Sequence, residues 1–257
     1  MNDEIALLKE LYSLSSKHSN YQLLSERLSN IINDNEIEIK SRYEKERLKY
    51  ILDKIEIKDR TILDIGGNTG YFTFEMIDRG VSKVQYYEGN DIHSKFVEIA
   101  STVLNVNEKI KITRKYFNFD KDDLNEQFDI VLLLNILHHV GDDFGDKEIT
   151  IEKAKDLIVE YLNNLSKVTN IAVIQFGFNW KGNKNLCLFE NGLKSEMIDF
   201  MLKGTKESWE VLNIGVAESK NNKICYRDLN NNNINRFDGL GEFLNRPIFI
   251  MKSLGDC

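Results

Sequence analysis

The chain has 257 residues, of which 42% are hydrophobic and 29% are charged, so it can bury a core of ordinary globular size. Acidic residues outnumber basic ones by 41 to 34, and the net charge of −7 disfavours nucleic acid as a partner. The three cysteines are scattered along the chain, which excludes a Cys-x-x-Cys zinc site and a disulfide framework.

The apolar runs of the sequence are short. The longest, such as residues 130–134, fall far below the roughly 20 residues that a transmembrane helix needs. The N-terminus is acidic where a signal peptide would be basic. We therefore expect a cytoplasmic protein without a membrane span, and the sequence indicates no particular oligomeric state.

Two stretches with helical periodicity open the chain. Apolar residues recur at helical spacing from Glu4 to about Leu28, which predicts one helix there. A second, highly charged stretch from about Glu36 to Ile55 keeps its apolar residues on one face. We expect residues 1–57 to form a helical lead-in.

A strand, a turn and a helix follow the lead-in. Thr61–Ile65 is a short apolar run ended by glycines, and a helical pattern then runs from Tyr71 to Arg79, with Gly80 as its stop. Strands and helices continue to alternate, which predicts a parallel sheet covered by helices. The further strands are expected at residues 83–87, 109–114, 128–134 and 170–176, and the helices at residues 94–104 and 149–166.

The pattern becomes less regular after residue 178. It predicts a polar, aromatic-bearing loop, then a helix, then three strand candidates, the last of which begins at the one proline. These elements are expected at residues 178–189, 195–202, 209–216, 223–227 and 247–251. We expect residues 58–257 to form one Rossmann-like α/β domain, with a mostly parallel seven-stranded sheet and helices on both faces.

The glycine-rich segment from Asp64 to Gly70 carries the main functional signal. Glycines after a buried strand let the backbone approach a ligand closely, and the next helix offers its N-terminus to an anionic group such as a carboxylate. Glu88 ends the following strand about 24 residues after Asp64, near the spacing at which a carboxylate meets ribose hydroxyls. The Gly-x-Gly-x-x-Gly pattern of nicotinamide enzymes does not fit, because Asn68 and Thr69 interrupt it.

Residues 63–72, which read Leu-Asp-Ile-Gly-Gly-Asn-Thr-Gly-Tyr-Phe, resemble motif I of the class I S-adenosylmethionine-dependent methyltransferases. Residues 128–131 together with residues 135–139 are similar to the fourth-strand motif of that family. The likeness covers about residues 50–180. It implies S-adenosylmethionine as the methyl donor and S-adenosylhomocysteine as the product.

The resemblance also implies roles for single residues. Asp64 would orient the amino group of the methyl donor, Gly66 and Gly70 would line its methionine part, and Glu88 would bind the ribose. Adenine would be met by residues 116–120, where Asn118 and Asp120 are both candidates. The predicted cofactor-binding residues are Asp64, Gly66, Gly67, Asn68, Gly70, Tyr71, Glu88, Asn118 and Asn135.

His138 and His139 are the candidate catalytic residues. They follow the fourth strand, and ligands of parallel sheets bind beyond the carboxyl ends of the strands. A hydroxyl acceptor benefits from a general base, and histidine titrates in the useful range. We expect one of the two histidines to be the base. The alternative is that the pair only satisfies local hydrogen bonds.

The segment after the fifth strand is a candidate wall of the acceptor site, because polar and aromatic residues alternate there. Asn179, Trp180, Lys181 and, later in the chain, Arg227 are the predicted substrate-binding residues. Lys184, Arg236 and Arg246 are further cations that could meet an anionic acceptor. Each has the alternative of an exposed loop or solvated surface position.

Asp142, Asp143 and Asp146 form a glycine-spaced acidic cluster. Some methyltransferases hold magnesium with carboxylates, but the spacing matches no calcium-loop pattern and a solvated loop explains it as well. We predict no metal.

These features predict an O-methyltransferase for a small polar acceptor, such as a sugar, a phosphate-type group or a capsular polysaccharide precursor. The sequence is also similar in style to bacterial enzymes that modify surface polysaccharides. One alternative is tRNA modification, because the glycine-rich segment also resembles the motif of wobble-uridine-modifying enzymes. Another is a non-catalytic subunit that keeps the fold and the cofactor.

Overall fold

The computed structural model describes residues 2–14, 22–32, 37, 39 and 41–255. By their contacts these residues form two compact units. Unit 1 takes in the described residues up to Leu48 and residues Glu56–Phe117, and unit 2 takes in Lys49–Ile55 and the residues from Asn118 onward. Across these described ranges, no helix has both the length and the hydrophobicity needed to cross a membrane.

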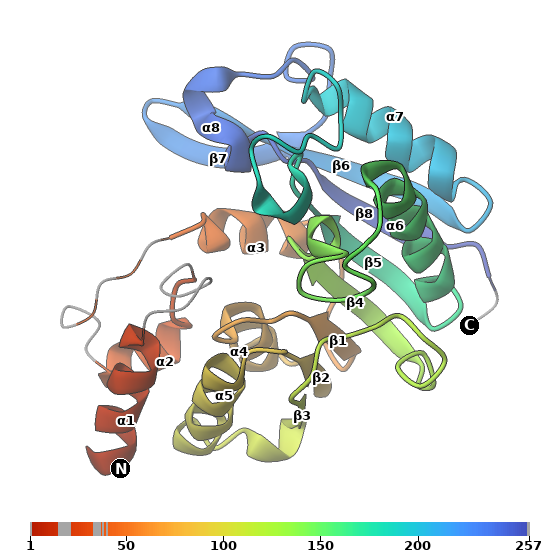
Figure 1. The fold of residues 1–257 in the computed structure, drawn as a ribbon. Helices are drawn as coiled ribbons and strands as arrows, with labels where there is room; N and C mark the ends of the chain where they lie inside the picture. The colour runs from red at the N-terminus through yellow and green to blue at the C-terminus, as the bar shows by residue number, and fades with distance from the viewer. Residues whose placement is uncertain (1, 15–21, 33–36, 38, 40, 256–257) are drawn as a thin grey trace. The chain divides into compact units, whose positions relative to one another are not determined.

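Unit 1 contains a three-stranded parallel sheet with the order β3-β2-β1 (Figure 1). Four of the five residues of β1 are buried, as expected for a strand that is covered on both faces. Its strands and their connecting helices are β1 (Thr61–Ile65), α4 (Tyr71–Asp78), β2 (Lys83–Tyr87), α5 (Asp91–Val103) and β3 (Ile110–Thr113).

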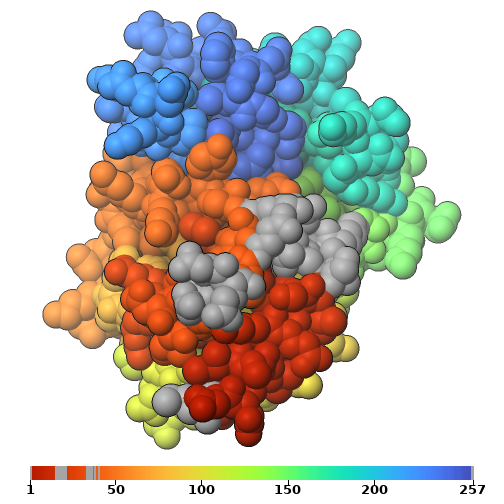
Figure 2. All heavy atoms as spheres, turned by 90° about the vertical axis from the view of Figure 1, so that its left-hand side faces the viewer, coloured from red at the N-terminus to blue at the C-terminus, as the bar shows by residue number. Residues whose placement is uncertain are grey.

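Three helices form the N-terminal lead-in, namely α1 (Asn2–Ser13), α2 (Glu26–Ile32) and α3 (Glu44–Leu52), of which α3 begins in unit 1 and ends in unit 2. Figure 2 shows the first two as a red surface on unit 1, where α1 packs on α5 through the rings of Tyr12 and Phe96, 5.9 Å apart. The prediction of one helix from Glu4 to Leu28 is wrong, because residues 22–25 are not helical. Long-range hydrogen bonds of Gln22 hold this segment instead, and residues 15–21 lie outside the described ranges.

Unit 2 contains five strands in the order β4-β5-β8-β6-β7. The first two are parallel, whereas β8 runs antiparallel to both β5 and β6, and β7 runs antiparallel to β6. The elements are β4 (Phe128–Leu134), α6 (Ile151–Leu165), β5 (Thr169–Gln175), α7 (Lys194–Thr205), β6 (Trp209–Lys220), β7 (Lys223–Asp228), α8 (Gly241–Leu244) and β8 (Ile248–Ser253).

The predicted Rossmann-like α/β class with a mostly parallel sheet is confirmed, but the sheet has eight strands instead of seven. The strand expected at residues 223–227 is β7, which forms a hairpin with β6. Asn221 and Asn222 make the turn with φ values of 52° and 58°. Two consecutive left-handed residues are the requirement of a tight two-residue hairpin, and asparagine tolerates that conformation.

Candidate functional site

The glycine turn, residues 64–70, joins β1 to α4 in unit 1. Gly66, Asn68 and Gly70 have φ values of 69°, 53° and 81°, in the left-handed region that favours glycine and, after it, asparagine. The side-chain oxygen of Asn68 accepts a hydrogen bond from the N–H of Thr69 at 2.8 Å. The backbone carbonyl of Asn68 accepts one from the hydroxyl of Tyr86. The turn therefore has one defined path, set by residues with the necessary backbone freedom.

Gly67 has a packing role. A Cβ at this position would lie 2.4 Å from the Tyr86 ring and 2.8 Å from Oδ2 of Asp64. A Cβ on Gly70 would likewise lie 2.9 Å from the ring of Phe74. Both glycines let the turn lie directly on the side chains of unit 1, and the ligand contacts predicted for them stay predictions.

Two carboxylates stand at the ends of β1 and β2. Burial raises the pKa of Asp64 to about 6; the 2.6 Å hydrogen bond from the Thr73 hydroxyl opposes this rise, and the charge of Glu88 adds to it. Glu88 accepts the N–H of Asn68 at 2.9 Å through one oxygen and that of Asn90 at 2.8 Å through the other. Each carboxylate oxygen has a second lone pair, so Glu88 can hold the turn and still accept ligand hydroxyls.

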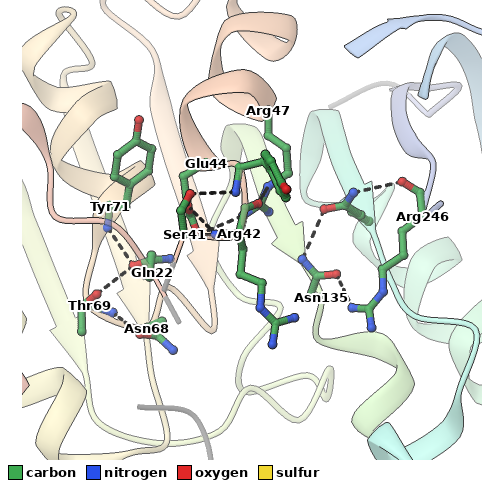
Figure 3. A network of polar contacts seen from close by, with 12 residues as sticks. Gln22, Ser41, Arg42, Glu44, Arg47, Asn68, Thr69, Tyr71, Asn135 and Arg246 are labelled. Carbon is green, nitrogen blue, oxygen red and sulfur yellow. Dashed lines mark hydrogen bonds and ion pairs between the residues drawn. The ribbon is translucent and has the colours of Figure 1, made fainter. Parts of the chain in front are cut away.

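Gln22 caps α4 from a distance in sequence. Gly70 precedes the helix and has no side chain with which to cap it. The Gln22 side-chain oxygen instead accepts the N–H of Tyr71 at 2.9 Å and the hydroxyl of Thr69 at 3.1 Å (Figure 3). Gln22 is not among the residues predicted from the sequence, because a cap that lies 49 residues from its helix leaves no local pattern.

The loop after β3, where adenine contacts are predicted, begins with an exposed aromatic ring. Tyr116 is 43% exposed, and its ring lies over Gly89, where a Cβ would be 2.5 Å from the ring. Farther along, in unit 2, the N–H of Asn118 donates to Asp123 at 2.7 Å. Asp120 accepts two backbone N–H groups of its own turn. One oxygen of the Asp120 carboxylate is thus engaged locally, and the adenine contacts predicted for Asn118 and Asp120 stay predictions.

The two histidines lie in unit 2, in the short helix η3 (Leu137–His139) that follows β4. Their ring centroids are 4.3 Å apart. His138 is 3% exposed, whereas 13% of the His139 side chain is exposed. Nδ1 of His139 lies 3.4 Å from a carboxylate oxygen of Asp143 and 3.8 Å from one of Asp142. His139 is therefore the more accessible histidine and the one with acidic neighbours.

Among the described residues, His139, Asp142 and Asp143 also form the one group of three or more His, Cys, Asp or Glu residues whose possible metal-ligand atoms all lie within 4.8 Å of one another. An imidazole nitrogen and two carboxylate oxygens are ligands that a divalent cation accepts. The absence of a metal, which the sequence analysis predicts, stays a prediction.

Asn135 lies at the end of β4 with a φ of 67° and joins a polar network in unit 2 (Figure 3). Its oxygen accepts a hydrogen bond from Arg246 at 2.7 Å, and its nitrogen donates to Gln175 at 3.2 Å. Arg246 in turn forms a bidentate ion pair with Glu242. The cofactor contact predicted for Asn135 stays a prediction, since the structure shows its amide engaged with Arg246 and Gln175.

Three predicted acceptor residues lie around η4 (Trp180–Gly182), next to η3. Trp180 is 6% exposed, and its indole N–H donates to the carbonyl of Val140 at 2.7 Å. The Lys181 ammonium lies 4.3 Å from the centroid of the Trp180 ring and donates to the carbonyl of Lys147. Asn179, just before η4, pairs with Cys187 in an isolated antiparallel bridge. These contacts attach the segment to the loop that carries the histidines.

Arg227, the fourth predicted acceptor residue, lies on β7. Its side chain is 56% exposed and lies 3.6 Å from the carboxylate of Glu218. The structure thus places it on the hairpin strand, and its role in binding an acceptor stays a prediction.

A sequence profile that describes a methyltransferase domain matches residues 63–160. A tRNA U34 carboxymethyltransferase from Helicobacter acinonychis (strain Sheeba) is 28% identical over 87 residues. The aligned stretch is 32% of this chain and 32% of that relative, so it spans about a third of the relative's length.

Two of the solved structures to which this chain is similar are WbdD and PH1948. WbdD, in a low-resolution structure with its C-terminal bundle ordered, is 11% identical with a TM-score of 0.57, over 96% of this chain and 40% of that chain. PH1948 from Pyrococcus horikoshii, a candidate RNA methyltransferase, is 12% identical with a TM-score of 0.48, over 99% of this chain and 100% of that chain. The profile match and the fold together support a methyltransferase domain in this chain.

We predict that Gly67→Ala lowers the free energy of unfolding by about 1–3 kcal/mol, because the added methyl group overlaps the Tyr86 ring. Urea denaturation measures the change. Gly255→Ala is the matched control, since a Cβ there has its nearest neighbour at 3.5 Å, and it should change stability by less than about 0.5 kcal/mol. Equal losses in the two variants would contradict the packing role of Gly67.

We predict that Asp64→Asn raises the melting temperature at neutral pH. The folded chain holds a proton on Asp64 up to about pH 6, against 3.8 for an ordinary aspartate. Between these values the folded state binds more protons than the unfolded state, so the stability of the wild type falls as the pH rises. A pKa shift of this size lowers the free energy of unfolding at neutral pH by about 3 kcal/mol. A neutral amide side chain in place of the carboxylate avoids this loss.

Thermal unfolding at pH 4 and pH 7.5 tests this. The stabilising effect of Asp64→Asn should be present at pH 7.5 and nearly absent at pH 4, while the exposed control Asp53→Asn shows little change at either pH. A gain of equal size at both pH values would show that ionisation of Asp64 is not its cause.

Proposed function

We propose that this chain is an S-adenosylmethionine-dependent O-methyltransferase of the cytoplasm that acts on a small polar acceptor, such as a sugar, a phosphate-type group or a capsular polysaccharide precursor. The observation that carries the proposal is the pair of buried carboxylates, Asp64 and Glu88, at the glycine turn. The methyl donor bears a sulfonium, an ammonium and two ribose hydroxyls. A cation beside Asp64 stabilises its ionised form, so this pair suits such a ligand.

The residues of unit 1 supply complementary groups for each part of the methyl donor. Glu88 accepts the ribose hydroxyls through its carboxylate oxygens, each of which can accept more than one hydrogen bond. Asp64 orients the amino group, and adenine stacks on the Tyr116 ring, which is 43% exposed. The Tyr71 N–H and the Thr69 hydroxyl, which Gln22 now holds, are the hydrogen-bond donors available to the methionine carboxylate.

His139 is our candidate for the general base. The His138 ring is buried, and both this ring and the Arg246 guanidinium approach within about 3 Å of the place that a Cβ on Gly177 would take. His139 has two carboxylates near its ring and more exposed surface. It is therefore the histidine better suited to receive a proton from an acceptor hydroxyl. An acceptor with an ionised phosphate-type oxygen would need no base.

Modification of tRNA is the second candidate function. The similarity to a tRNA U34 carboxymethyltransferase favours it. The net charge of −7 opposes it, because nucleic-acid backbones reward clustered positive charge.

Calorimetric titration tests methyl-donor binding. We expect S-adenosylmethionine and S-adenosylhomocysteine to bind, and Glu88→Gln to weaken binding about tenfold or more, because charge-assisted hydrogen bonds to the ribose are lost. Asp91→Asn removes an exposed carboxylate nearby in sequence and should bind normally. A wild-type chain that binds neither compound would refute the proposed function.

Binding should also release a proton near pH 6, because the cationic ligand stabilises the ionised form of Asp64. The apparent binding enthalpy at pH 6 should then differ between buffers with different ionisation enthalpies. This difference should vanish in Asp64→Asn and persist in Asp53→Asn. An enthalpy independent of buffer in the wild type would show that Asp64 is not beside the ligand's charge.

A panel assay identifies the acceptor. Nucleotide sugars, phosphorylated metabolites and tRNA are incubated with S-adenosylmethionine, and release of S-adenosylhomocysteine is measured. With a hydroxyl acceptor, His139→Gln should lower kcat about a hundredfold. Turnover with tRNA alone would favour the second candidate, and binding of the methyl donor without any turnover would indicate a non-catalytic subunit.

A further inference from the structure

We propose that Asp143 is a positioning residue that holds the His139 ring and keeps its proton on Nδ1, so that Nε2 is the basic nitrogen. This inference rests on the proposed function, since it completes the role of His139 as base. It concerns the histidine loop, residues 137–146 of unit 2.

The first evidence is the placement of the carboxylates around Nδ1. Asp143 is the nearer, at 3.4 Å against 3.8 Å for Asp142, and its side chain is also the less exposed, at 19% against 34%. A less exposed charge is screened less by water and salt. Nδ1 of His139 is itself buried, so its 3.4 Å contact with the Asp143 carboxylate is shielded from water.

The second evidence is the backbone of the loop. The N–H groups of Asp142 and Asp143 both donate to the carbonyl of His139, at 2.9 and 3.2 Å. This turn folds the two carboxylates back over the histidine that precedes them. Gly141 makes the reversal possible with a φ of 80°, and its N–H donates to the carbonyl of Phe144 at 2.7 Å.

The third evidence is that packing anchors both sides of the turn. Phe144, next to Asp143, is buried with its ring 5.7 Å from Phe119 and 6.3 Å from Tyr161. Val140, which directly follows His139, accepts a hydrogen bond from the Trp180 indole N–H at its backbone carbonyl. A carboxylate on an anchored turn keeps its direction without further loss of entropy, as a preorganised site requires.

The proposed role follows from the position of the single ring proton of a neutral imidazole. Neutral histidine has one N–H, and a carboxylate beside Nδ1 favours the tautomer with the proton on Nδ1 and the basic lone pair on Nε2. As the acceptor oxygen bonds to the methyl carbon, the carbon–sulfur bond breaks with its electron pair left on sulfur. The acceptor's proton passes to Nε2, and the ionised Asp143 stabilises the imidazolium.

Other charged or titratable groups also lie around the His139 ring. Asp142 is the second carboxylate, and His138 is the neighbouring ring in η3. From η4, Lys181 points its ammonium at the Trp180 ring and the Lys147 carbonyl. The test must therefore separate Asp143 from Asp142 and from a general change of charge.

Ring nitrogen NMR provides the test without any acceptor. The chain has only four histidines, so His139→Gln identifies the His139 signals. We expect the wild type to show the Nδ1–H tautomer of His139. Asp143→Asn should give a mixture of tautomers and move the midpoint of the titration to lower pH, because a carboxylate that favours imidazolium is gone.

Asp146→Asn is the matched control, because it removes an exposed carboxylate of the same loop that lies outside the group around His139. It should leave the tautomer unchanged, and Asp142→Asn should have the smaller effect of the two neighbours. If Asp143→Asn is indistinguishable from Asp146→Asn, the inference is refuted.

Kinetics with a hydroxyl acceptor from the panel gives the second readout. Asp143→Asn should lower kcat about tenfold or more, with KM and the Kd for S-adenosylmethionine unchanged. Unchanged kcat would refute the inference and leave the proposed function intact. Failure of the wild type to bind the methyl donor would refute the proposed function, whereas the tautomer measurement would still decide the role of Asp143.

Addition of Mn²⁺ tests the competing role as a metal site. We expect no selective broadening of the His139 signals at equimolar Mn²⁺. Broadening that both Asp142→Asn and Asp143→Asn abolish equally would overturn the positioning role in favour of a metal centre.

Discussion

The hydrogen bond between the Glu88 carboxylate and the N–H of Asn68 closes the glycine turn on the end of β2, and the proposed donor site depends on it. This bond holds Asn68 in its left-handed conformation. In that conformation the backbone carbonyl of Asn68 accepts a hydrogen bond from the Tyr86 hydroxyl. The same carboxylate is the group proposed to bind ribose. One side chain thus sets the shape of the turn and part of its affinity, so stability and binding cannot be tuned separately there.

Much of this architecture could be predicted from local sequence. The strand and turn around Asp64 and the asparagine hairpin after β6 are determined by neighbouring residues, through burial patterns and backbone preferences. The N-terminal helix was predicted too long because Gln22 is held by Thr69 and Tyr71, far along the chain. Apolar periodicity records the face of a helix, and it carries no information about a hydrogen bond to a distant loop.

The same limit applies to the residues of unit 2. His138 and His139 are equivalent in sequence, and the structure separates them through Arg246 on one side and the acidic turn on the other. The sequence predicts Trp180 as a residue of the acceptor site. In the structure its side chain is buried and donates a hydrogen bond to the carbonyl of Val140. An aromatic residue in a polar loop is compatible with either position, and only its tertiary partners distinguish them.

The cap that Gln22 places on α4 bears on how this protein can be divided. Hydrophobic patterning sets the start of the α/β domain near residue 58, and a fragment cut there would keep every strand. It would lose the group that now satisfies the first N–H of α4, at the end of the helix that faces the glycine turn. The lead-in thus completes the turn to which we assign the methyl donor, and a fragment that keeps this cap has to begin before Gln22.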